Sequence, residues 1–93
     1  MDIFKEYAKL VGEDKVSELR AQGHVIGQIK KARHAKKMSQ QKLADAIQMS
    51  KSTIARIESG VAVPNLRTLQ LIADALDTPL TIQPDRRELE TIR

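Results

Sequence analysis

The chain has 93 residues, enough for one small domain with a short segment at either end, and a formal net charge of +4. It has no cysteine, which excludes disulfides, cysteine-ligated zinc and thiol nucleophiles, and each of its two histidines lacks a partner at metal-ligand spacing. No segment has the apolar core of a signal peptide or the length of a membrane span. We therefore expect a cytoplasmic protein without a metal or a cofactor.

Positive charge is concentrated in the middle of the chain. Residues 30–56 carry eight lysines and arginines against one acidic residue, Asp45, which gives +7, whereas residues 1–20 sum to −1 and residues 57–93 to −2. Such a cationic segment would attract a polyanion through long-range electrostatics. A solvated basic helix face is the alternative that charge alone leaves equally open.

An apolar stripe at helical spacing opens the chain, ending where Gly12 interrupts it, and a weaker pattern through Val16 and Leu19 continues to Gln22–Gly23. This pattern predicts a helical extension over residues 1–24, either packed on the core or serving as an arm that binds a partner. The members of the first stripe are Ile3, Phe4, Tyr7, Leu10 and Val11.

Helical patterns recur from residue 25 onward, and the first of them reaches Met38. Ser39 and Ser50 each precede a short apolar pattern as expected of N-caps, Gly60 is expected to end the second short helix, and Asn65 is expected to cap a final helix that stops before Pro79. The residues expected to face the core are Ile26 and Ile29, then Leu43, Ala44 and Ile47, then Ile54 and Ile57, and lastly Leu66, Leu69, Ile72, Ala73 and Leu76.

The end of the chain predicts a short strand, because Leu80 and Ile82 alternate with polar residues. A single strand needs a partner, which a second subunit or another protein would supply. The prediction for the whole chain is an all-α fold: a bundle of about five helices over residues 25–80, a helical extension before it, and a strand-like tail over residues 81–93.

Three segments, IKKARHAKKMSQQKLADAI, SKSTIARIESG and PNLRTLQLIADAL, occur in that order between Ile26 and Leu80. Together they resemble the lambda-repressor-like helix-turn-helix family, also called the Xre or Cro/C1 type. In such a motif the second of two short helices places its N-terminal residues in the major groove of DNA. The resemblance therefore implies that this chain binds double-stranded operator DNA and associates with the nucleoid.

Site residues follow from the resemblance, position by position. It implies base contacts for four residues of the second short helix and phosphate contacts for polar residues around it. It also implies a partly buried, structural ion pair between Arg33 and Glu58. The base-contacting candidates are Lys51, Ser52, Thr53 and Arg56, and the phosphate-contacting candidates are Gln40, Gln41, Ser50, Ser59, Asn65, Lys37 and Arg67.

The chain departs from the family pattern at two positions. Members of the family often have glycine where this chain has Gln48, because the turn there favours a left-handed backbone, and often have glycine at Lys37. We therefore expect strain or a slightly different turn at Gln48, and added positive charge at Lys37.

Lambda-type domains bind operators as symmetric dimers, so the resemblance implies a homodimer formed by the last helix, the strand-like tail or both. The dimerisation candidates are Leu76, Leu80 and Ile82. The length of the chain and its flanking segments also resemble small antitoxins of the HigA and HipB type. That likeness implies a repressor of its own operon that neutralises a small basic RelE/HigB-like ribonuclease toxin.

The toxin-binding candidates are Ile3, Phe4, Tyr7, Leu10 and Val11. A stand-alone repressor of phage or plasmid type is the first alternative function, and a helix-turn-helix-like module that only bridges proteins is the second. An enzyme is not expected, because the sequence offers no acid/base pair, activated nucleophile, phosphate-binding loop or metal cluster.

Overall fold

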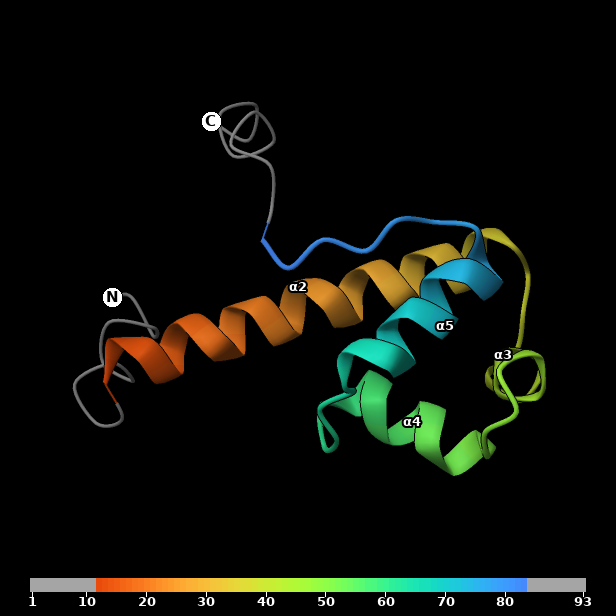
Figure 1. Cartoon of the computed structure of the whole chain (residues 1–93), viewed down its shortest axis with the longest axis horizontal. Coiled ribbons are helices and arrows are strands. Elements are labelled where there is room, and N and C mark those ends of the chain that lie inside the picture. The colour runs from red at the N-terminus through yellow and green to blue at the C-terminus, as the bar shows by residue number, and fades with distance from the viewer. Residues whose placement is uncertain (1–11, 84–93) are drawn as a thin grey trace.

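The computed structural model describes residues 12–83, which form four helices: α2 (Glu13–Ala35), α3 (Gln40–Ala46), α4 (Lys51–Ser59) and α5 (Leu66–Leu76). The long helix α2 contacts α4 and α5, and α3 also contacts α4 and α5 (Figure 1). The first half of α2 extends beyond the other three helices (Figure 1). The helix predicted over residues 3–11 lies outside the described residues.

Helix α2 runs without a break through the boundary predicted near residue 24. Glycine inside a helix costs about 0.5–1 kcal/mol relative to alanine, which weakens a helix but does not end it. Val25 and Ile29, which follow Gly23, are 9% and 0% exposed, and the burial of these side chains maintains the helical backbone across Gly23 and Gly27. The boundary predicted at residue 24 therefore falls inside one continuous helix, Glu13–Ala35.

Side-chain caps start the three shorter helices as the sequence predicts. The Ser39 hydroxyl accepts a hydrogen bond from the backbone N–H of Lys42 at 3.0 Å, and the Ser50 hydroxyl accepts one from that of Thr53 at 3.2 Å. The Asn65 side-chain oxygen does the same for Thr68 at 2.8 Å. Each cap satisfies one of the backbone donors that the first turn of a helix leaves without a partner.

The core lies where all four helices meet, and the predicted apolar faces supply most of it. Leu66 is an exception, because it is 80% exposed, whereas Ile72 and Leu76 are 0% exposed. At 3.6 residues per turn, Leu66 lies about 120° around α5 from Ile72, so the buried face passes through Thr68 instead. The buried members of the core cluster are Val25, Ile29, Ala32, Leu43, Ala44, Ile47, Ile54, Ile57, Ile72 and Leu76.

The segment after α5 runs back along α2 and is not a strand in the described structure (Figure 1). The side-chain amide of Gln28 takes both backbone hydrogen bonds of Thr81: the Thr81 N–H donates to Oε1 at 2.9 Å, and Nε2 donates to the Thr81 carbonyl at 2.6 Å. The Thr81 hydroxyl also lies 3.0 Å from His24 Nε2. The predicted strand at Leu80–Ile82 is absent because a side chain of α2 satisfies the backbone groups that a neighbouring strand would need.

Two of the three dimerisation candidates pack inside the domain. Leu76 is 0% exposed, and Leu80 is half-buried against the core, so these side chains stabilise the chain's own fold. Ile82 remains 64% exposed. No helix in residues 12–83 combines the length and the apolar character that crossing a membrane requires.

Candidate nucleic-acid interface

Helices α3 and α4 form the two-helix unit that the sequence predicts. Ala44 and Ile54, a small residue and a branched one, are 0% and 1% exposed where the two helices pack. The turn between them passes through Gln48, whose φ of 58° is left-handed. The backbone N–H of Met49 donates to the Ala44 carbonyl at 2.9 Å across this turn. The strained turn expected at Gln48 is therefore present, and it sets the angle at which α4 leaves the pair.

Helix α4 has a buried face and an exposed polar face. Ile54, Ile57 and Glu58 are buried, whereas the side chains of Lys51 and Arg56 are exposed. Two cations at i and i+5 on the outer side of a helix can reach the acceptor atoms of bases in a major groove. The predicted base-contacting side chains thus point away from the core, and Ser52 is exposed beside them.

Hydroxyl groups at the start of α4 are linked to one another. The Ser50 hydroxyl lies 3.0 Å from that of Ser52 and 2.8 Å from that of half-buried Thr53, and it also caps the helix. A hydroxyl that already accepts the backbone N–H of Thr53 can still donate its own hydrogen to one neighbour. This network orients the three hydroxyls before any ligand arrives.

The phosphate-contacting candidates divide according to the hydrogen bonds that they already make. Gln41 Nε2 donates to Asp45 at 2.8 Å, and the Ser59 hydroxyl donates to the Arg56 carbonyl at 3.1 Å. A phosphate needs a donor: the Ser59 hydroxyl would have to exchange its bond to reach one, whereas the Gln41 amide keeps a second N–H for it. Asn65 uses its oxygen as the cap of α5, which leaves its amide nitrogen as the donor. Lys37 and Arg67 are exposed.

The charge concentrated in residues 30–56 is almost entirely on the surface. Seven of the eight basic residues of that segment are exposed, and only Arg33 is buried. The first half of α2 and the loop before α5 have no comparable cationic cluster. These exposed residues, here called the basic surface, lie on the second half of α2, the loop after it, α3 and α4, and they include the base-contacting candidates Lys51 and Arg56. The exposed residues are Lys30, Lys31, Lys36, Lys37, Lys42, Lys51 and Arg56.

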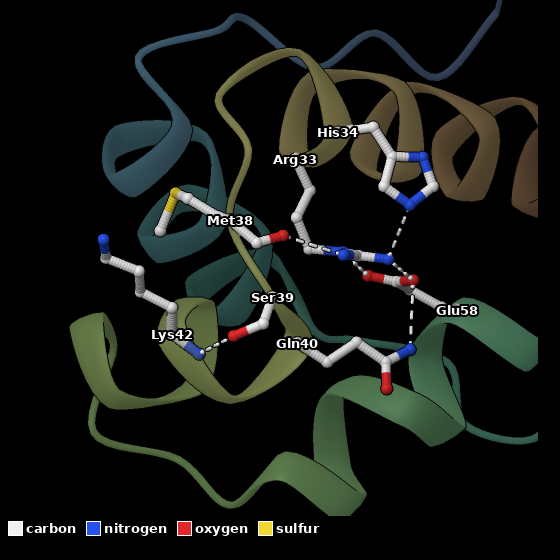
Figure 2. A network of polar contacts seen from close by, with 7 residues as sticks. All are labelled: Arg33, His34, Met38, Ser39, Gln40, Lys42 and Glu58. Atoms are coloured by element: carbon white, nitrogen blue, oxygen red, sulfur yellow. Dashed lines mark hydrogen bonds and ion pairs between the residues drawn. The ribbon is translucent and has the colours of Figure 1, made fainter.

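Arg33 and Glu58 form a two-pronged ion pair between α2 and α4 (Figure 2). Arg33 Nε donates to Glu58 Oε2 at 2.8 Å, and Nη2 donates to Oε1 at 2.9 Å. The Arg33 and Glu58 side chains are 9% and 4% exposed. Parallel donation from a guanidinium to a carboxylate is among the strongest pairings available to side chains. The structure therefore brings together the two residues for which the family resemblance implies a pair.

Further contacts extend this pair to α3 (Figure 2). Arg33 Nη1 donates to the carbonyl of Met38 at 2.9 Å, His34 Nε2 lies 3.2 Å from Arg33 Nη2, and Gln40 Nε2 donates to Glu58 Oε1 at 3.2 Å. Gln40, a predicted phosphate contact, is half-buried and belongs to this network. These contacts hold the end of α2, the start of α3 and the end of α4 in one arrangement.

The pKa of Glu58 lies below its ordinary value of 4.5. Burial opposes ionisation, but the hydrogen bonds from Arg33 and Gln40, and the positive charges of Arg33 and Lys30, together outweigh it. Glu58 is therefore ionised at neutral pH, and the buried pair carries no net charge. Among the described residues, no buried side-chain nitrogen or oxygen lacks a hydrogen-bond partner.

Sequence reasoning missed the bonds from Gln40 to Glu58 and from Gln28 to Thr81. Neither has a local signal, because the partners are 18 and 53 residues apart in the chain. Within residues 12–83, no group of three or more histidines, cysteines or carboxylates is placed to hold a metal ion.

Comparison with known proteins gives two matches for this part of the chain. Residues 29–83 match the helix-turn-helix family model. An uncharacterized HTH-type transcriptional regulator of Sinorhizobium fredii is 36% identical over 63 residues, which are 68% of this chain and 32% of that protein. The chain thus spans about a third of the length of this curated relative. No solved structure matches the chain significantly. On the family match over residues 29–83, this chain belongs to the helix-turn-helix family.

Proposed function

We propose that this protein binds double-stranded DNA in a sequence-specific manner and represses transcription. The observation that carries the proposal is the outer face of α4, where Lys51 and Arg56 are exposed while Ile54, Ile57 and Glu58 of the same helix are buried. A lysine or arginine donating to guanine O6 and N7 is the commonest specific contact in the major groove. The relative from Sinorhizobium fredii is described as an HTH-type transcriptional regulator, which supports the same assignment.

Selection from a random duplex library, followed by titration of the selected site, tests this assignment. Lys51→Ala and Arg56→Ala should each weaken binding by about 1–3 kcal/mol, which is roughly 5-fold to 150-fold, and should relax the preference at one base pair. The matched control is Lys31→Ala, which removes an exposed cation of the same basic surface from α2. It should leave sequence preference unchanged and, if Lys31 contacts a phosphate, should reduce the dependence of log affinity on log salt by about one.

Two results would contradict DNA reading by α4. Unchanged affinity and unchanged preference in the Lys51→Ala, Arg56→Ala double variant would show that α4 does not read DNA. No selected sequence and no salt dependence would favour the protein-bridging module instead, because phosphate contacts make DNA binding strongly salt-dependent.

We further propose that the protein binds its operator as a homodimer, since one module of this size buries little surface on DNA. Ile82 is the one dimerisation candidate that remains largely exposed, at 64%. Sedimentation velocity over micromolar concentrations, with and without operator, tests the dimer. A single module bound to a single half-site at saturation would contradict it.

The finer proposal is an antitoxin that neutralises a RelE/HigB-like ribonuclease toxin and represses the shared operon. Its support is the apolar stripe of residues 3–11, which a DNA-binding domain does not need for its own contacts. Purification of the protein from its native host tests it, with a variant lacking residues 1–24 as the comparison. A small basic ribonuclease in equal amount would support the antitoxin, and its absence would leave a stand-alone repressor.

A further inference from the structure

An apolar groove lies between the first half of α2, the loop after α4 and the segment after α5, away from α3. Its volume is about 310 Å³, and a second hollow of about 200 Å³ continues it along α5. Val25, Leu69 and Ile82 line both hollows. The larger one is also lined by Lys15, Glu18, Gln22, Ile57 and Val63.

The chemistry of this groove excludes a polyanion as its occupant. The only ionisable residues that line it are Lys15 and Glu18, whose side chains pair with each other at 3.6 Å. Val63 and Ile82 at its edge are 77% and 64% exposed, so apolar surface stands in water there. An apolar helix with little net charge fits these properties, because it would cover that surface without leaving a buried charge unpaired.

We propose that the groove binds residues 3–11 of the same chain. Gly12 joins this segment to α2 with a φ of 90° and a ψ of 155°, a conformation that side-chain-bearing residues rarely adopt and that ends the helical path of α2 there. Lys15 and Glu18, at one end of the groove, follow Gly12 within six residues. The segment therefore begins beside the site that it would occupy.

The lengths of the two elements agree. Residues 3–11 span at least about 13 Å at 1.5 Å per residue, and α2 covers about 15 Å between Gly12 and Gln22. The segment is therefore long enough to lie along the part of α2 that lines the groove. The stripe contains Phe4 and Tyr7, the only two aromatic residues of the chain, and these are the bulky side chains that a hollow of this size can accept.

The covalent link favours the chain's own segment over a second copy. A short connection through one glycine gives the segment an effective concentration in the millimolar range or higher, far above that of a separate molecule. Any protein partner that uses either the groove or residues 3–11 must therefore first displace this contact. Docking of this segment does not depend on DNA binding, because Ile57, the α4 residue that lines the groove, is on the buried face of that helix, and the basic surface takes no part.

Tyr7 provides a direct probe, since the chain has one tyrosine and no tryptophan. Iodide quenching of tyrosine fluorescence in the full chain measures how accessible that ring is. If the docked state is populated tenfold more than the open state, the quenching constant should be about tenfold lower than that of free N-acetyltyrosinamide. A tenfold population ratio corresponds to a docking free energy of about 1.4 kcal/mol. The variant Val63→Glu, which places a charge in the groove, should restore the free value.

Val61→Glu is the matched control, because Val61 is 76% exposed in the same loop but lines neither hollow. This control should keep Tyr7 protected, and circular dichroism should show that both variants retain the fold. Tyr7 that is as accessible as the free amide would overturn the proposal, and so would protection that survives Val63→Glu. Protection that appears only as protein concentration rises would assign the groove to a second copy instead.

Discussion

Replacing Glu58 by glutamine tests how far the buried ion pair holds the domain together. Glutamine keeps the shape of the side chain and one acceptor oxygen, but it presents an NH₂ group to a guanidinium that now donates to both carboxylate oxygens, at 2.8 and 2.9 Å. The charge of Arg33, whose side chain is 9% exposed, would then have no partner. Breaking a buried pair in this way costs about 3–5 kcal/mol.

That loss is large for a domain of this size, whose total stability is expected to be about 5–15 kcal/mol. Urea denaturation followed by circular dichroism at pH 7 should show a lower midpoint with an unchanged slope, and the melting temperature should fall by at least about 12 °C. The control is Asp45→Asn, which removes the same charge from an exposed residue and should change stability by less than about 0.5 kcal/mol.

The pH dependence of folding stability follows from the lowered pKa of Glu58. A carboxylate whose pKa is depressed in the folded state stabilises the fold fully above its unfolded pKa, and this stabilisation is lost as pH falls through the folded pKa. The gap between the natural protein and Glu58→Gln should therefore be constant near neutral pH and should shrink below pH 4.5, the ordinary value. A gap below about 1 kcal/mol at pH 7, or one that persists unchanged at pH 3, would refute this reasoning.

Substitutions at four further residues test other parts of the fold. Gln48→Gly should stabilise the domain by about 0.5–1 kcal/mol in urea denaturation, because relief of a left-handed backbone exceeds the entropy that glycine loses on folding; a destabilised variant would contradict this. Gly23→Ala and Gly27→Ala should each stabilise α2 by a similar amount, since an added Cβ would meet no side chain or other element of the described fold within 4 Å; a lowered urea midpoint would contradict this. Gln28→Ala should remove hydrogen-exchange protection from the Thr81 amide with little change in melting temperature, and retained protection would count against the contact.

Local signals explain which parts of the fold the sequence could predict. The caps at Ser39, Ser50 and Asn65 use a side chain and a backbone N–H three residues later, so the pattern and the interaction occupy the same short segment. The core faces of α3 and α4 follow from helical periodicity for the same reason. The path of α2 through Gly23 was not predictable from local propensity, because the deciding contribution is tertiary packing of Val25 and Ile29.

In the candidate site, too, the features that a local pattern encodes could be predicted, and those that depend on how helices pack could not. Lys51 and Arg56 point outward because the other face of their helix is apolar, and the sequence pattern predicts this. That Gln40 is half-buried beside Glu58 depends on how α3 and α4 cross, which no short segment encodes. The strand expected near Ile82 failed similarly, because a side chain 53 residues earlier satisfies the Thr81 backbone.

All four helices end in the same way, and this accounts for the three left-handed residues that are not glycine. After each helix the residue with positive φ donates to a carbonyl three residues back, and the next residue donates to one five residues back, which is the Schellman arrangement. Only α4 uses the glycine, Gly60, that usually occupies this place. At Lys37 and Gln48, half-buried methionines follow and pack against the core, so their burial offsets the backbone strain. Lys37 and Gln48, where the family often has glycine, therefore keep a left-handed backbone because the methionine that follows each of them packs against the core.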